Sequence, residues 1–167
     1  MRAIRFAENP LITPALGEEI GTNINGPSVV RKPEWLSNLP GRYLMYFAHH
    51  QGLNIRLAYA DKLTGPWMLY PGGTLQLEEA RCAWHVASPD VHVDHDRQRI
   101  VMYYHGVLED PKGQWSFRAE SADGVHFVSD DKILGAFYLR VFEYGGAYYG
   151  LAKDNKAPGG ALLLRSS

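Results

Sequence analysis

The sequence predicts an all-β fold, and three observations lead to that prediction. Short runs rich in Val, Ile, Leu and Tyr are separated by turns rich in Gly, Pro, Asn and Asp, a pattern typical of strands joined by tight connections. The 17 Gly and 10 Pro residues interrupt the chain so often that few helical periodicities remain. The same succession of strands also recurs along the chain, and internal repetition outweighs any single-element assignment.

The first 73 residues are predicted to form a leader and a first group of four strands. In the leader, residues 1–25, a short strand is possible at residues 3–6, and the prolines at positions 10 and 14 prevent a helix. The four strands that follow are expected at 26–30, 42–48, 54–60 and 67–70.

A second group of strands repeats the first. Ser88-Pro89-Asp90-Val91 matches Gly26-Pro27-Ser28-Val29 at a spacing of 62 residues, and residues 117–123 match residues 55–61 at the same spacing. Loop chemistry is therefore repeated together with the alternation of apolar residues. The strands of this unit are expected at 90–93, 99–105, 117–123 and 126–128, with a polar turn at 94–98.

A third group contains strands at 138–142, 147–152 and 161–166, with Gly145-Gly146 as its first turn. Four-stranded meanders arranged radially form a β-propeller. The sequence therefore predicts one domain, 1–167, that is a partial β-propeller of repeated four-stranded antiparallel meanders with an incomplete third blade. The alternative is a β-sandwich with similar hairpins. The blades are placed at 26–73, 86–130 and 136–167.

Composition excludes several classes of protein. A net charge of −1 provides no basic field for phosphates, so no nucleic-acid partner is expected. The single cysteine, Cys82, rules out an internal disulfide. No apolar run resembles a signal peptide or reaches transmembrane length, so a cytoplasmic protein without a membrane partner is expected. An open strand edge pairs readily with another chain, which predicts a homo-oligomer, most simply a dimer.

Several motifs resemble a known family. The segments NGPSVV, YLMYFAHH, IRLAYADKLTGPW and ASPDVHVD are similar to those of the five-bladed β-propeller glycoside hydrolases of the arabinanase and β-xylosidase type. The most telling piece is the blade ending Ala58–Trp67, which reads AYADKLTGPW. The resemblance covers most of residues 20–167, so the chain resembles a truncated member with about three of the five blades.

The resemblance implies a sugar-sized pocket but an incomplete catalytic set. Family members use three carboxylates: a general base, a residue that tunes the pKa of its neighbours, and a general acid. Asp90 matches the pKa-tuning aspartate. Asn25-Gly26 stands where the base belongs, and an amide cannot accept a proton from water. In the third unit, Glu143 lies beside a turn and is expected to be solvated rather than to act as the acid.

The first strand of each propeller blade lines the axis, so residues at its start are expected to converge on one cavity. Asp90 is the candidate catalytic residue, or alternatively a cap of its own strand. Arg56 either ties blades together, like Arg118, or reaches a carboxylate ligand. The histidines are either rim ligands or satisfied strand ends. The candidate substrate-binding residues are Asn25, His49, His50, Arg56, Trp84, His85, His92, His105 and Arg140.

No metal or cofactor is expected. His92 and His95 point to opposite faces of a strand, so the hairpin that carries them is interpreted as solvated. Trp67, on the fourth strand of its blade, is expected to pack between blades, whereas Trp84 beside His85 is the better ligand contact.

Two functions remain open at this point. The first is a glycosidase-like protein that binds or hydrolyses a carbohydrate in a propeller funnel. The alternative is a non-catalytic carbohydrate-binding or assembly module, a truncated propeller stabilised by oligomerisation. Paired carboxylates around Asp90 favour hydrolysis, whereas imidazoles and amides favour binding.

Overall fold

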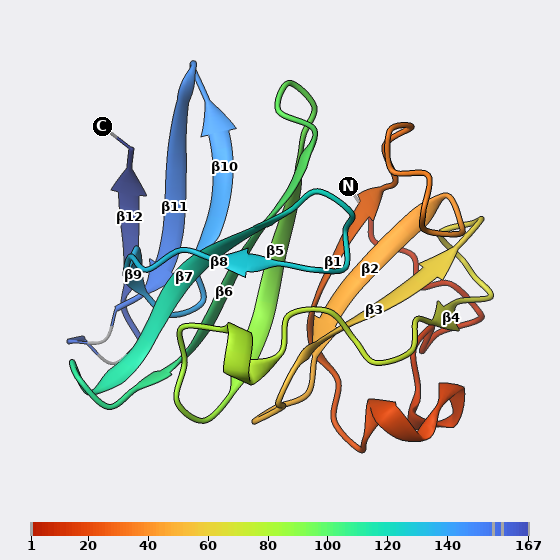
Figure 1. The fold of residues 1–167 in the computed structure, drawn as a ribbon, viewed down its shortest axis with the longest axis horizontal. Helices are drawn as coiled ribbons and strands as arrows, with labels where there is room; N and C mark the ends of the chain where they lie inside the picture. Colours follow the sequence, from red (N-terminus) through yellow and green to blue (C-terminus); the bar gives the residue numbers. More distant parts are fainter. Residues whose placement is uncertain (1, 155, 158, 167) are drawn as a thin grey trace.

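The computed structural model describes residues 2–154, 156–157 and 159–166, and its strands form three antiparallel sheets. Figure 1 shows the sheets side by side, with the first on the right and the third on the left. The sheets have the orders β1-β2-β3-β4, β5-β6-β7-β8 with β9 added beside β7, and β10-β11-β12. This is the predicted all-β architecture, a partial β-propeller whose third sheet has three strands.

The predicted strands of all three units are present, and the inner hairpin of the second sheet is longer than predicted. Residues 3–6 do not form a strand. The strands are β1 (Asn25–Arg31), β2 (Tyr43–Ala48), β3 (Ile55–Ala60), β4 (Met68–Leu69), β5 (Val86–Asp94), β6 (Arg99–Leu108), β7 (Gly113–Ser121), β8 (Val128–Ser129), β9 (Gly135–Ala136), β10 (Arg140–Tyr144), β11 (Ala147–Lys153) and β12 (Ala161–Arg165). The helices of the described residues are the 3₁₀ turns η1 (Pro14–Leu16), η2 (Glu18–Ile20) and η3 (Leu77–Glu79). Within these described residues, no helix has the length and apolarity needed to cross a membrane.

One hydrophobic core joins the first and second sheets. Tyr46 and Leu57 from the first sheet and Met102 and Phe117 from the second belong to this core and are fully buried or nearly so. The opposite face of the first sheet buries Trp67 with Met45 and Phe47, and the N-terminal residues Leu11 and Ile12 cover this cluster. Trp67 is therefore buried as predicted, but beneath the N-terminal segment rather than between sheets.

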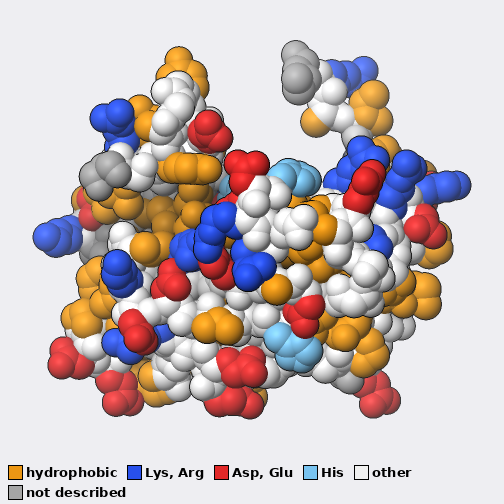
Figure 2. All heavy atoms as spheres, turned by 45° about the horizontal axis from the view of Figure 1, so that its top comes forward, with side chains coloured by type: hydrophobic (Ala, Val, Ile, Leu, Met, Phe, Trp, Pro, Cys, Tyr) orange, Lys and Arg blue, Asp and Glu red, His pale blue; other side chains and the backbone are white. Residues whose placement is uncertain are grey.

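The third sheet has a much smaller core. Ala136, Leu139 and Ala152 are buried there, while Tyr144, Tyr148 and Leu163 are 74%, 57% and 64% exposed. Figure 2 shows hydrophobic side chains gathered on the left, over this sheet. Less apolar surface is buried in this sheet than in the other two, so it contributes less to stability.

Each sheet begins its inner strand with the same backbone feature. Gly26, Ser88 and Tyr138 all have left-handed φ values, of 54°, 49° and 58°. The pairing of β1 and β5 with their neighbours shifts register at this point, which is the signature of a β-bulge. Two of the three residues are not glycine, and such strained positions often lie at ligand sites.

The strand register also corrects one detail of the predicted repeat. Asn25 pairs with Ala48 and Ala87 pairs with His105, while the backbone N–H of Lys153 donates to the carbonyl of Phe137 at 3.0 Å. The residues at equivalent places are therefore Ala48, His105 and Lys153. His105 does not correspond to His49, because the β5–β6 turn is shorter than a match of similar residues assumes.

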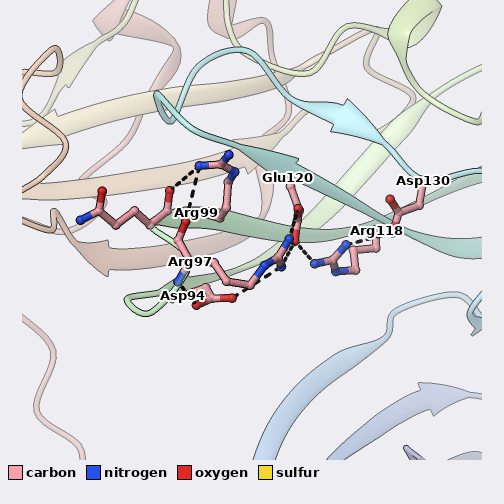
Figure 3. Close-up of polar contacts among 7 residues, drawn as sticks. Asp94, Arg97, Arg99, Arg118, Glu120 and Asp130 are labelled. Carbon is pink, nitrogen blue, oxygen red and sulfur yellow. Dashed lines mark hydrogen bonds and ion pairs between the residues drawn. The ribbon is translucent and has the colours of Figure 1, made fainter.

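Arg118 stabilises its own sheet rather than linking two sheets. It forms ion pairs with Glu120 on the same strand and with Asp130, the latter at 3.0 Å (Figure 3). Glu120 also accepts both guanidinium nitrogens of Arg97, which in turn lies 3.6 Å from Asp94. The predicted role of Arg118 as a tie between blades through backbone carbonyls is thus replaced by a side-chain network along the second sheet.

Candidate functional site

The starts of the inner strands and the ends of their neighbours enclose a cavity of about 630 Å³, which we call the central cavity. This volume lies in the range of small-molecule sites. All three sheets contribute to its wall, because the equivalent residues Asn25, Ala87 and Phe137 precede the three left-handed positions. The lining residues are Asn25, His50, Gln51, Trp84, His85, Ala87, His105, Val107, Gln114, Phe137, Tyr138 and Lys153.

The central cavity brings together five of the ten candidate residues. These are Asn25, His50, Trp84, His85 and His105. The central cavity also contains lining residues that were not among the candidates, including Phe137, Tyr138 and Lys153. The repeat was the signal that could have found them, since Phe137-Tyr138 occupies the place of Asn25-Gly26 and of Ala87-Ser88.

The other candidates lie elsewhere. His49 and Arg56 lie near Gly21, where a Cβ added to the glycine would come within 3.0 Å of His49 and 3.8 Å of Arg56. Arg56 is buried, with its guanidinium carbon 6.0 Å from the centre of the Phe47 ring. His92 lines a separate groove of about 750 Å³ at the other end of β5.

Two polar atoms in the wall of the central cavity are buried without a hydrogen-bond partner among the described residues. They are Oδ1 of Asn25 and Nδ1 of His105. His105 is only 3% exposed, and the centre of its ring lies 6.0 Å from that of His85 and 4.7 Å from that of Tyr138. Buried polar groups are almost always satisfied, so an unpartnered pair in one wall is a feature that needs an explanation.

The imidazoles of His85 and His105 are neutral at pH 7. Burial, reinforced by the nearby His85, Arg140 and His50, lowers the pKa of His105 to about 4. Burial and His50 likewise lower the pKa of His85. A neutral imidazole carries one donor and one acceptor nitrogen, so these rings offer hydrogen bonds without charge.

Asp90 links the second and third sheets. Its Oδ2 accepts hydrogen bonds from the backbone N–H of Val141 at 2.7 Å and from His92 at 3.1 Å, and its Oδ1 lies 3.8 Å from Arg140. Arg140 also donates to the carbonyl of Pro89 at 2.8 Å. Burial alone raises the pKa of the Asp90 carboxyl, but His92, Val141 and Arg140 outweigh burial and lower it, so Asp90 is ionised.

The same link occurs between the first and second sheets. Ser28 occupies the place of Asp90 in the repeat, and its hydroxyl accepts a hydrogen bond from the backbone N–H of Val91 at 2.9 Å. Both side chains therefore hold the inner strand of the next sheet, which is a structural task. Asp90 does not line the central cavity, and no Asp or Glu does so among the described residues.

A metal site is not formed by the residues that the structure describes, since they contain no group of three potential His, Cys, Asp or Glu ligands. His92 is instead hydrogen-bonded to Asp90, and its ring lies 5.7 Å from that of Tyr103.

No protein-family model matches the chain. One relative in sequence is the uncharacterized protein R118 of Acanthamoeba polyphaga mimivirus, which is 33% identical over 168 residues. The match includes 87% of this chain and 47% of the relative, so the chain spans about half the length of that protein.

Several solved glycoside hydrolases have a similar structure. The GH43_1 enzyme from Xanthomonas citri complexed with xylose aligns at a TM-score of 0.63 and 13% identity, over 86% of this chain and 42% of its own. CoXyl43, a GH43 β-xylosidase/α-arabinofuranosidase from a compost microbial metagenome, aligns at 0.63 and 13%, over 87% and 45%. Zg3597, a family 117 glycoside hydrolase from Zobellia galactanivorans, aligns at 0.59 and 14%, over 86% and 43%. These similarities show the propeller fold.

Proposed function

We propose that this chain binds a carbohydrate in the central cavity and does not hydrolyse it by itself. The observation that carries the proposal is the pair of unpartnered atoms, Asn25 Oδ1 and His105 Nδ1, in the wall of one cavity. An unsatisfied buried polar group costs about 1–3 kcal/mol, which a bound hydroxyl group offsets by supplying a donor or an acceptor. A ligand rich in hydroxyl groups suits both atoms.

Aromatic rings beside these atoms support a sugar as the ligand. Trp84 and Tyr138 line the central cavity and are 58% and 42% exposed, although both are large rings. An exposed ring next to hydrogen-bonding groups offers an apolar face for the C–H surface of a sugar. The structural similarity to glycoside hydrolases, one of them complexed with xylose, points to the same ligand class.

The chemistry of the lining favours binding over hydrolysis. Glycoside hydrolysis by the usual route needs two carboxyl groups flanking the bond, one to donate a proton and one to activate water or attack. The described lining provides imidazoles, amides and a lysine, with no carboxylate. Asn25 stands at the place of the expected base, and Asp90 is engaged with Val141 and His92.

Trp84→Ala is expected to weaken sugar binding about tenfold, because losing a stacked ring removes roughly 1.4 kcal/mol of contact energy. Isothermal titration with methyl β-D-xylopyranoside and with xylotriose at pH 7 measures this effect. Trp84→Phe is the matched control, since it keeps an aromatic face, and its affinity should fall only about threefold. Absence of binding by the wild type, or an unchanged affinity in Trp84→Ala, would contradict the proposal.

The hydrolytic alternative is tested on the same protein. Release of 4-nitrophenol from its β-D-xylopyranoside is expected at the rate of buffer alone. Turnover above that rate would favour the enzyme and would require a carboxylate from outside the described lining.

We also propose that the chain forms a homodimer through its third sheet. The exposed side chains Tyr144, Tyr148 and Leu163 support this, as does the number of sheets, because closed propellers have four to eight blades. Light scattering is expected to give twice the chain mass, and Leu163→Asp to give the mass of one chain. Val128→Asp, at a residue 76% exposed on the second sheet, is the control and should remain dimeric. A monomeric wild type would overturn the proposal.

A further inference from the structure

Lys153 introduces a charge into a lining that is otherwise neutral in most of its polar groups. The amides of Asn25, Gln51 and Gln114 carry no charge. The lowered pKa values of His85 and His105 keep both imidazoles neutral at pH 7. With no carboxylate in the described lining, nothing in the wall balances the ammonium group of Lys153.

The position of Lys153 is set by the fold. Lys153 is the last residue of β11, and its backbone N–H is bonded to the carbonyl of Phe137, the residue that begins the bulge of the third sheet. Its Nζ lies 5.0 Å from the centre of the Phe137 ring, a cation–π distance. None of the ion pairs between described residues involves Lys153.

The repeat shows that this charge is particular to the third sheet. The equivalent residues are Ala48 in the first sheet and His105 in the second. The backbone therefore requires no cation at this place. A lysine held against an aromatic ring at the cavity wall, rather than paired with a carboxylate of the protein, remains available to a carboxylate of the ligand.

We propose that the central cavity selects a sugar that carries a carboxylate, such as a hexuronic acid, and that Lys153 is the specificity-determining residue that binds this carboxylate. The inference rests on the proposed carbohydrate binding and adds the class of sugar. The neutral groups, His105 and Asn25, bind hydroxyl groups that acidic and neutral sugars share. The ammonium group alone distinguishes the two.

Two sugars that differ only by the carboxylate test the proposal: methyl β-D-glucuronopyranoside and methyl β-D-xylopyranoside. Wild-type protein is expected to bind the glucuronide about tenfold more tightly, since a charge-assisted hydrogen bond is about twice as strong as a neutral one. Lys153→Gln should bind both sugars equally, with the affinity for the xyloside unchanged. Raising the salt concentration should weaken only the binding of the glucuronide.

Two control variants separate this role from a general effect of charge. Lys153→Arg keeps the cation and should retain the preference, whereas Lys156→Gln removes a lysine that does not line the central cavity and should leave it unchanged. Equal wild-type affinities for the two sugars, or a preference that persists in Lys153→Gln, would overturn this inference and leave the proposed function standing. Failure of both sugars to bind would overturn the proposed function, and this inference with it.

Discussion

Gly26→Ala is expected to lower the free energy of unfolding by about 4 kcal/mol, with roughly 3 from overpacking and 1 from the left-handed backbone. A Cβ at this position would come within 2.5 Å of Cα and 2.9 Å of Cβ of Ser88. The nearest obstacle is a backbone atom, so no side-chain rotation relieves the contact. The inner strands of the first two sheets must separate, which disturbs the core that they share. Equilibrium unfolding in urea measures the loss.

Gly145→Ala is the matched control for this prediction. Gly145 has a φ of 59°, close to the 54° of Gly26, but nothing lies within 4 Å of the position that its Cβ would take. This variant therefore bears the backbone strain without the steric contact, and should cost about 1 kcal/mol. Equal losses in the two variants would mean that the approach of the first two sheets tolerates a methyl group.

Asp90→Ala is expected to lower the free energy of unfolding by about 3 kcal/mol, because it leaves the N–H of Val141 without its acceptor and removes the counter-ion of Arg140. The side chain of Asp90 is 16% exposed, so water replaces the carboxylate only in part. Asp90→Asn keeps an oxygen for Val141 and should lose about half as much. Thermal unfolding should show a decrease of roughly 6–12 °C for Asp90→Ala.

The charge of Asp90 also predicts how stability depends on pH. Its pKa in the folded protein is below the ordinary value of 3.8, so its ionised form stabilises the fold above that pH. This contribution is lost as the pH falls through the lowered pKa, and it should be absent from Asp90→Asn. Asp96→Ala, in the exposed turn of the same hairpin, is the control and should change stability by less than about 0.5 kcal/mol.

These variants also separate the two interpretations of Asp90. A structural link affects stability and leaves the affinity of the remaining folded protein for sugar nearly unchanged. A substrate contact affects that affinity in Asp90→Asn by more than the stability loss explains. Titration well below the unfolding temperature of each variant distinguishes these outcomes.

The strands were predictable because their signals are local. Alternating apolar residues and turn chemistry repeat at a spacing of 62 residues between Pro27 and Pro89, and each sheet forms from strands that follow one another in the chain. Asn25, Trp84 and His85 were identifiable because the start of every inner strand faces the same cavity. The same rule, applied to the third unit, identifies Phe137 and Tyr138, whose apolar side chains gave no signal of their own.

Patterns within a few tens of residues are enough to predict the repeats, the all-β fold and about half of the lining of the central cavity. The role of Asp90 needed the folded arrangement, since its hydrogen-bond donor is the backbone N–H of Val141, 51 residues away, and a backbone N–H has no signature in sequence. The folded arrangement was also needed to show that His105 and Lys153 share one wall and that no described carboxylate faces them. The reason is that burial, pairing and charge balance depend on which sheets meet.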